Sequence, residues 1–452
     1  MSVGGRDGRL VAWMGSARSV RLYDSSADRF STLARPQGIH GVAAAARLQA
    51  LVVLMAGPGA LVVGRDAGDQ LEAPVPVKVH GRSSAGSEND LARLLASPGD
   101  ADAAQRLISN DRGRALLTYH RLWGRVMPVT STDTVPEGAL PPVPGVDVHL
   151  LALGALAELA DVLDRALGVP WLVFKGPVLA SRYARPDSRT YQDLDILVRP
   201  ADMLLVIQEM QGRGWQLLDR NWVLLRDRVP AEVHLLSPGG LVVDLHWSMT
   251  SVVARGLGMG IAADRLLARA ESVDLGGLRV PALAPADALV HVCVHAGMGG
   301  ADRLGWLVDV AVSLPGTDNG DVAAAAAAFR AEGLVSAVMA RTRRVLGVPA
   351  ESTALGSSSG RLIWSVAAGL SERLAPVWAV QSDGSAASVL PRLAAGRRPR
   401  ASGLVRALGR PGGRPPRFEN GPANPMSMFY RAGDWADVEA FARHAAAVDA
   451  GL

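Results

Sequence analysis

The chain has 452 residues, of which 49% are hydrophobic and 5% aromatic, so it is long enough to bury the cores of two or three domains. Its one cysteine, Cys293, excludes an internal disulfide and fits a reducing compartment. The start of the sequence lacks the charged and apolar regions of a signal peptide, and the most apolar tract, 41–63, is interrupted by charged and glycine–proline residues. We therefore expect a cytoplasmic protein with no membrane partner.

Residues 1–85 alternate short apolar runs with turn residues, which predicts a small strand-rich module with one helix around 42–52. The sequence assigns this module no function. Helical periodicity follows over 91–123, and then a loop rich in proline and threonine over 128–144.

The centre of the chain alternates helical and strand patterns, which predicts an α/β (α+β) fold with helices packed on a small mixed sheet. The expected helices are 148–167, a short one that begins near Pro177, and 201–211. The expected strands are 171–174, 194–198, 215–218, 230–235 and 241–247. Beyond residue 283 the pattern is mostly helical.

Acidic residues alternate with apolar ones in two of these strands. Asp193 and Asp195 are two residues apart, as are Asp244 and His246, so each pair points to one face of its strand. Buried carboxylates are costly unless they are paired or bound to a metal. The pattern therefore predicts that the three aspartates bind paired Mg²⁺ (or Mn²⁺) ions, with Asp244 as a metal ligand or a general base. Solvated or ion-paired carboxylates, and a core histidine at His246, are the alternatives.

Three residues upstream of the aspartates fit the binding of phosphate groups. Lys175 is one of only two lysines among 47 basic residues, which indicates that a compact ammonium is wanted at this position. Gly176 would let backbone N–H groups approach phosphates at the start of a helix. Arg189 would bind a triphosphate through bidentate hydrogen bonds from its planar guanidinium group. A purely structural role is the alternative for each.

Taken together, these motifs resemble a known family. The order Lys-Gly, Arg, Asp-x-Asp-x-Leu-Val and acidic-Leu-His-Trp is similar to that of the uncharacterised nucleotidyltransferase family of the DNA polymerase β-like superfamily. The resemblance covers 88–345 and includes the segments 119–121, 283–287, 291–295 and 303–309. The chain departs from it at two points: polymerase β-like enzymes usually carry Gly-Ser at the turn that holds Lys175 and Gly176, and many family members carry Glu at the position of Asp244.

The resemblance implies a polymerase β-like nucleotidyltransferase core. We expect a domain over 86–345, with its core at 148–250 and a helical part at 283–345, between the strand-rich module 1–85 and a mainly helical C-terminal region 346–452. His291 and His295 are interpreted as residues of a core or contact helix rather than zinc ligands, because no Glu follows His291. Asp309 is expected to pair with Arg303.

Positive charge is concentrated in the C-terminal region. The segment 384–418 contains eight arginines and no acidic residue, and without these arginines the formal net charge of +4 would become −4. Its glycine and proline content predicts a loop or mobile arm. A solvated linker is the favoured interpretation, and a docking arm for nucleic acid or an acidic partner is the alternative.

The implied function is metal-dependent transfer of a nucleoside monophosphate from an NTP, such as ATP, to a small-molecule or peptide acceptor, with release of pyrophosphate. The resemblance points to natural-product (peptide) or polysaccharide biosynthesis. Two alternatives remain at this stage: a nucleotide- or partner-binding scaffold without turnover, and a nucleic-acid-modifying transferase that uses 384–418. The acceptor, the nucleotide and the oligomeric state are not predicted.

Overall fold

The computed structural model describes the backbone of eight strands between residues 2 and 77, and the ranges 85–96, 100–126, 146–184, 188–348 and 427–452. The loop expected over 128–144 and the Arg-rich segment 384–418 lie outside the described residues. Within the described ranges, none of the helices combines the length and the hydropathy that a membrane span requires.

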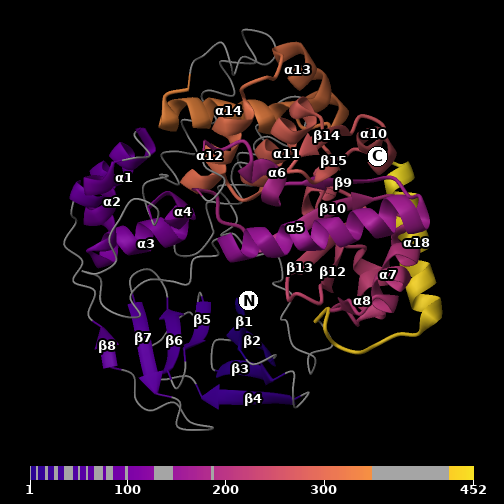
Figure 1. Ribbon diagram of the computed structural model, residues 1–452, viewed down its shortest axis with the longest axis horizontal. Coiled ribbons are helices and arrows are strands. Elements are labelled where there is room, and N and C mark those ends of the chain that lie inside the picture. Colours follow the sequence, from indigo (N-terminus) through magenta and orange to yellow (C-terminus); the bar gives the residue numbers. More distant parts are fainter. Residues whose placement is uncertain are drawn as a thin grey trace.

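The N-terminal strands form two four-stranded antiparallel sheets (Figure 1). The first contains β1 (Ser2–Arg6), β2 (Arg9–Gly15), β3 (Ser19–Asp24) and β4 (Arg29–Ala34). The second contains β5 (Ala44–Leu48), β6 (Leu51–Ala56), β7 (Ala60–Arg65) and β8 (Val75–Val77). The strand-rich prediction is confirmed, but the helix expected around 42–52 is wrong. The apolar run that begins at Leu51 contains two adjacent valines, whose branched side chains favour a strand.

A seven-stranded mixed sheet lies at the centre of the rest of the chain, which confirms the predicted α/β class. Its strands, in spatial order, are β11 (Gln216–Leu217), β12 (Glu232–Leu236), β13 (Val242–His246), β10 (Asp193–Val198), β9 (Trp171–Phe174), β15 (Arg279–Ala282) and β14 (Glu271–Asp274). Two neighbouring pairs, β10–β13 and β9–β15, are parallel and the others antiparallel.

Helices cover both faces of this sheet. Those of the central region are α5 (Val146–Ala160), which continues as the π-helical segment η2 (Asp161–Leu167), α6 (Gly176–Ala180), α7 (Met203–Gly212), α8 (Trp222–Arg228), α9 (Val252–Gly256) and α10 (Ala263–Leu267). The helical part that follows contains α11 (Pro285–Met298), α12 (Leu304–Ser313), α13 (Asn319–Ala328) and α14 (Glu332–Leu346). Before the sheet come α1 (Ala85–Ala96), α2 (Ala101–Ile108), α3 (Asp111–His120) and α4 (Trp123–Val126), and the chain ends with α18 (Trp435–Ala450).

Side chains that alternate along the strands pack into two different hydrophobic cores. On β10, Leu194 and Ile196 pack into one core with residues of α5 and α7, whereas Leu197 joins a second core with α1–α4 and α11–α14. On β9, Val173 belongs to the first core and Phe174 to the second. Because Asp195 lies between Leu194 and Ile196, it faces the second side, toward the helical part. The sequence pattern thus decides which side of the sheet carries the acidic residues.

The C-terminal helix α18 packs on the central region, beside α8 (Figure 1). Phe441 is fully buried in the first core, with its ring centroid 5.8 Å from that of Trp222. The side-chain amide of Asn221 donates a hydrogen bond to the Ser427 carbonyl at 2.8 Å. Residues 427–452 therefore contribute buried side chains to the first core, together with residues of the central region.

Helix α3 is held close to the start of α12. The backbone N–H of Leu304 donates to Nδ1 of the fully buried His120 at 3.2 Å. At Gly305 a Cβ atom would lie 2.5 Å from the His120 carbonyl oxygen, so only glycine permits this approach. Burial, reinforced by the charge of Arg303, lowers the pKa of His120 to about 3.

This histidine is expected to make the protein acid-sensitive. Between the ordinary histidine pKa of roughly 6.5 and the folded-state value, the unfolded chain binds a proton that folded His120 does not, so stability falls as pH falls, by about 1.4 kcal/mol per pH unit. The variant His120→Asn keeps a hydrogen-bond acceptor but does not titrate. Denaturant unfolding should show wild type losing roughly 2–3 kcal/mol more than the variant between pH 6.5 and pH 4.5. Parallel pH profiles for the two proteins would contradict this.

Candidate active site

The acidic face of the sheet is built on the parallel pair β10–β13. Asp195 stands directly opposite Asp244 in the register of these strands, and Leu197 stands opposite His246. Ligating atoms of Asp195, Asp244 and His246 lie within 4.8 Å of one another. The structure therefore brings together three of the residues that the sequence predicted as a site.

Asp195 is buried and paired with two cationic or polar groups. Lys175 Nζ lies 2.6 Å from its Oδ1 atom, and Nε2 of His246 lies 3.2 Å from the same oxygen. Burial acts to raise the pKa of Asp195, but the charge of Lys175 and the contact with His246 outweigh it and hold the pKa below its ordinary value. Asp195 is therefore ionised at neutral pH.

Asp244 has a different environment. Its side chain is mostly buried, and its one ion-pair partner among the described residues is distant: Nε2 of His234 lies 3.9 Å from its Oδ1 atom. Burial raises the pKa of Asp244 to about 7, against the opposing charges of His234 and His246. One carboxylate of the pair is thus compensated by a lysine, and the other is poised to exchange a proton near neutral pH.

Asp193 lies at the exposed start of β10, opposite Val242, and is not among the residues whose ligating atoms converge. Partial desolvation and the neighbouring charge of Asp195 raise its pKa, while the charges of Lys175 and Arg121 act in the opposite direction. Its predicted role as a metal ligand stays a prediction. Arg121, in a left-handed conformation at the end of α3, is a nearby cation; the sequence placed it in the segment 119–121 of the resemblance but predicted no role for it.

The turn between β9 and α6 aims Lys175 at the carboxylates. Lys175 has a φ of 58° and Gly176 a φ of 44°, both in the left-handed region that favours glycine. Lysine rarely adopts this conformation, which is typical of residues held in place by a site. The role of Gly176 in phosphate binding stays a prediction.

Arg189 lies against the same turn, and a carboxylate holds it there. Its Nε atom is 2.9 Å from Oδ1 of Asp309, and its Nη1 atom donates to the Gly176 carbonyl at 3.4 Å. The hydroxyl of Tyr183 also donates to Asp309, at 2.6 Å. The sequence placed Asp309 with Arg303, and this was wrong. Arg303 is the N-cap residue that precedes α12 and Asp309 follows six positions later, so the two side chains do not share a helix face.

Arg303 stacks on aromatic rings instead. Its guanidinium carbon lies 4.8 Å from the ring centroid of Trp306 and 5.5 Å from that of Tyr119. These rings hold the guanidinium near the end of α3.

Strand β12 adds polar residues that the sequence did not single out. Glu232 stands opposite His246, and His234 stands opposite Asp244. Nδ1 of His234 lies 2.9 Å from Oδ2 of the buried Asp219. Burial acts to lower the pKa of His234, but the nearby carboxylates, Asp219 first, raise it to about 10. The Glu-x-His spacing is the same two-residue alternation that marks the aspartates, and it could have identified these two residues as site candidates on a strand that was already predicted.

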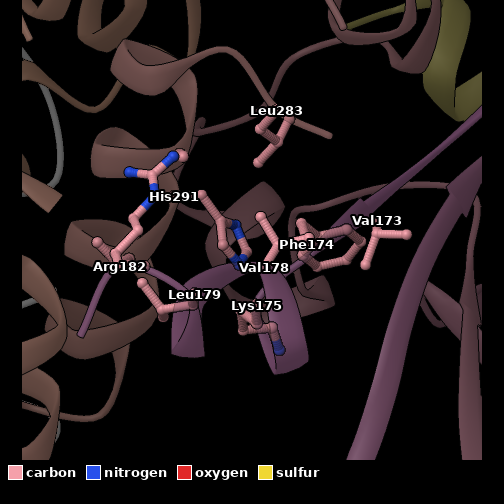
Figure 2. Close-up of a pocket in the computed structure, with 10 residues that line it drawn as sticks. Val173, Phe174, Lys175, Val178, Leu179, Arg182, Leu283 and His291 are labelled. Carbon is pink, nitrogen blue, oxygen red and sulfur yellow. The ribbon is translucent and has the colours of Figure 1, made fainter. Parts of the chain in front are cut away.

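A small cavity of about 20 Å³ is lined in part by Lys175 (Figure 2). It is lined mainly by apolar side chains of β9, α6 and α11, with His291 among them. Figure 2 shows His291 between Phe174 and Leu179, next to Lys175. The volume suffices for one water molecule but not for a nucleotide. His291 is a core residue, as the sequence predicted, and belongs to no potential metal group among the described residues.

Removing the polar atoms of His291 is expected to stabilise the fold. Neither of its buried ring nitrogens has a hydrogen-bond partner among the described residues, and burial lowers its pKa well below the ordinary value. Replacement of an unsatisfied polar group by an apolar one of similar size, His291→Leu, should raise the free energy of unfolding by about 1 kcal/mol. The matched control is His149→Leu, which loses a 2.7 Å hydrogen bond to Tyr191 and should lower stability. Destabilisation by His291→Leu would instead indicate that a water in the cavity satisfies the ring.

The aspartates of β10 and β13 thus stand in register, and Lys175 of the turn after β9 contacts one of them. Residues 147–347 match the family model described as "Uncharacterised nucleotidyltransferase". The resemblance that the sequence predicted is confirmed over that range, and it supports nucleotidyl transfer as the general activity.

Two further comparisons add little. The crystal structure of an antigenic nucleotidyltransferase-like protein from Paracoccidioides brasiliensis is similar at 14% identity and a TM-score of 0.30, over 48% of this chain and 98% of that one. No curated protein matches this chain.

Proposed function

We propose that this protein is a divalent-metal-dependent nucleotidyltransferase. It transfers a nucleoside monophosphate from an NTP to a small-molecule or peptide acceptor and releases pyrophosphate. The observation that carries the proposal is the direct pairing of Asp195 and Asp244 on parallel strands, with their ligating atoms and one of His246 within 4.8 Å of one another. The family match over 147–347 supports the reaction class.

The residues present fit a divalent cation. Within the part of the chain that the structure describes, Asp244 has no cationic partner closer than 3.9 Å, and its pKa of about 7 indicates that the neighbouring charges do not fully compensate its ionised form. Asp195 and Asp244 would hold the ion, with Asp193 at the exposed entrance. Carboxylate ligands favour Mg²⁺ or Mn²⁺. Such an ion would neutralise charge on the triphosphate and acidify the acceptor hydroxyl.

The protein's own cations have separate tasks in this proposal. Lys175, held 2.6 Å from the buried Asp195, brings a positive charge next to the aspartates, and Arg121 adds another near Asp193. Arg189 is anchored by Asp309 and contacts the carbonyl of Gly176, so it also keeps the turn in place.

The test is label transfer from each α-labelled NTP in the presence of Mg²⁺ and extract of the native host, together with pyrophosphate release. Wild type is compared with the double variant Asp193→Ala/Asp195→Ala. A matched control is Asp321→Asn, which changes an exposed acidic residue on α13. Label on a product with wild type and the control, but not with the double variant, would establish the transferase and reveal the acceptor.

The same samples distinguish the alternatives. Mg²⁺-dependent NTP binding without transfer, in every extract fraction, would favour a nucleotide-binding scaffold. Transfer to RNA or DNA, with binding that weakens steeply as salt rises, would favour a nucleic-acid-modifying enzyme. Absence of NTP binding would overturn the proposed function.

A further inference from the structure

The hairpin of β12 and β13 carries a second group of potential metal ligands beside the first. Glu232 and His234 point to the same side as Asp244 because they alternate along β12 and pair in register with β13. Ligating atoms of Glu232, His234 and Asp244 all lie within 4.8 Å of one another. The two groups share one residue, Asp244.

The imidazole of His234 is oriented in the way that metal-bound histidines usually are. Asp219 Oδ2 lies 2.9 Å from Nδ1 of His234 and also accepts the backbone N–H of His234 at 2.6 Å. The Asp219 side chain is fully buried, so this contact fixes the ring. Nδ1 is thereby occupied, and Nε2 is directed toward Asp244. A carboxylate behind the histidine is the usual outer partner of a metal-ligating imidazole.

An independent observation comes from His246, which is only 6% exposed. Its buried Nδ1 atom lies 3.1 Å from Oε2 of Glu232, an ion-pair distance, and has no hydrogen bond of standard geometry among the described residues. It points toward the same Glu232 that contributes to the second group, so this contact holds the Glu232 carboxylate on the side of the sheet that carries Asp244 and His234.

We propose that Glu232, His234 and Asp244 form a second cation site, for a divalent transition-metal ion of the Zn²⁺ type. A ligand set of two carboxylates and one imidazole suits such an ion, whereas Mg²⁺ prefers oxygen ligands alone. Asp219 is a positioning residue for this site. The site adjoins that of the proposed transfer through Asp244, but binding of the ion requires no turnover.

The test is Zn²⁺ binding to the full chain by isothermal titration calorimetry in excess Mg²⁺, with Co²⁺ absorption spectra as a second readout of nitrogen ligation. We expect one Zn²⁺ to remain bound per chain. His234→Gln and Glu232→Gln should each weaken binding by more than about 100-fold, and Asp219→Asn by about 10- to 100-fold, as expected for an outer partner. His444→Gln, on the exposed face of α18, is the matched control and should bind as wild type does.

Two results would overturn the proposal: displacement of Zn²⁺ by Mg²⁺ in wild type, or wild-type affinity in both His234→Gln and Glu232→Gln. The Glu232 side chain is 37% exposed, so that variant is expected to fold even if His234→Gln does not, and circular dichroism checks both. Nucleotidyl transfer is measured separately with Mg²⁺ alone. Retained Zn²⁺ binding without any transfer would reject the transferase and leave the second site standing.

Discussion

Asp195→Asn is expected to reduce nucleotidyl transfer by at least about a thousandfold while leaving the fold in place. The substitution keeps the size of the side chain and removes the one charge that contacts both Lys175 and His246. A neutral amide binds a divalent cation far more weakly than a carboxylate. Initial rates of label transfer at saturating NTP, over a range of Mg²⁺ concentrations, measure the effect.

A second variant separates chemistry from stability. Loss of the carboxylate leaves Lys175, whose side chain is 18% exposed, with an uncompensated charge, and this should cost a few kcal/mol of stability. The double variant Asp195→Asn/Lys175→Met removes that charge as well. It should recover much of the stability and none of the activity. Transfer by Asp195→Asn within tenfold of wild type would show that Asp195 is not part of the reaction centre.

Asp309→Asn should lower the free energy of unfolding by about 3–5 kcal/mol. Asp309 and Arg189 are 12% and 13% exposed, and the substitution leaves the guanidinium in a buried position without its carboxylate. Asparagine still accepts the hydrogen bond from Tyr183, so the change isolates the ion pair. Because Arg189 also contacts the Gly176 carbonyl, we expect the KM for NTP to rise. Denaturant unfolding and steady-state kinetics measure the two effects.

The control for this pair is an exposed one of the same kind. Glu439 and Arg443 are 49% and 68% exposed on α18, and Glu439→Gln should change stability by less than about 1 kcal/mol. If Asp309→Asn and Glu439→Gln had similar small effects, the pair of Asp309 and Arg189 would contribute no more than a surface ion pair.

The central strands of the sheet could be predicted because their side chains alternate or form apolar runs. β9, β10, β12 and β13 all meet this condition, and the structure places them within two residues of the expected positions. β14 and β15 were missed. They are four residues long, β14 has no alternation, and β15 contains Pro281. Short strands near the end of a sheet owe their conformation to pairing with distant segments rather than to local pattern.

The candidate active site shows the same distinction between features that follow from the local sequence and features that depend on distant segments. The common face of Asp244 and His246 follows from spacing alone, but the contact of Asp195 with Asp244 depends on the register of two strands that lie about 50 residues apart. The pairing of Arg189 with Asp309 spans 120 residues and has no local signal. The sequence therefore predicts which side chains share a strand face, whereas the strand register decides which of them meet.

Helix α18 has a consequence for how the protein is made. Phe441 fills the core between the sheet and α8, and Asn221 is bonded to Ser427 across 206 residues. During synthesis, the central sheet emerges from the ribosome long before the helix that covers it. Until then its apolar surface is open to solvent and to other chains, a condition that favours aggregation and slow folding. Chaperone binding to nascent chains should therefore persist until residues 427–452 have emerged.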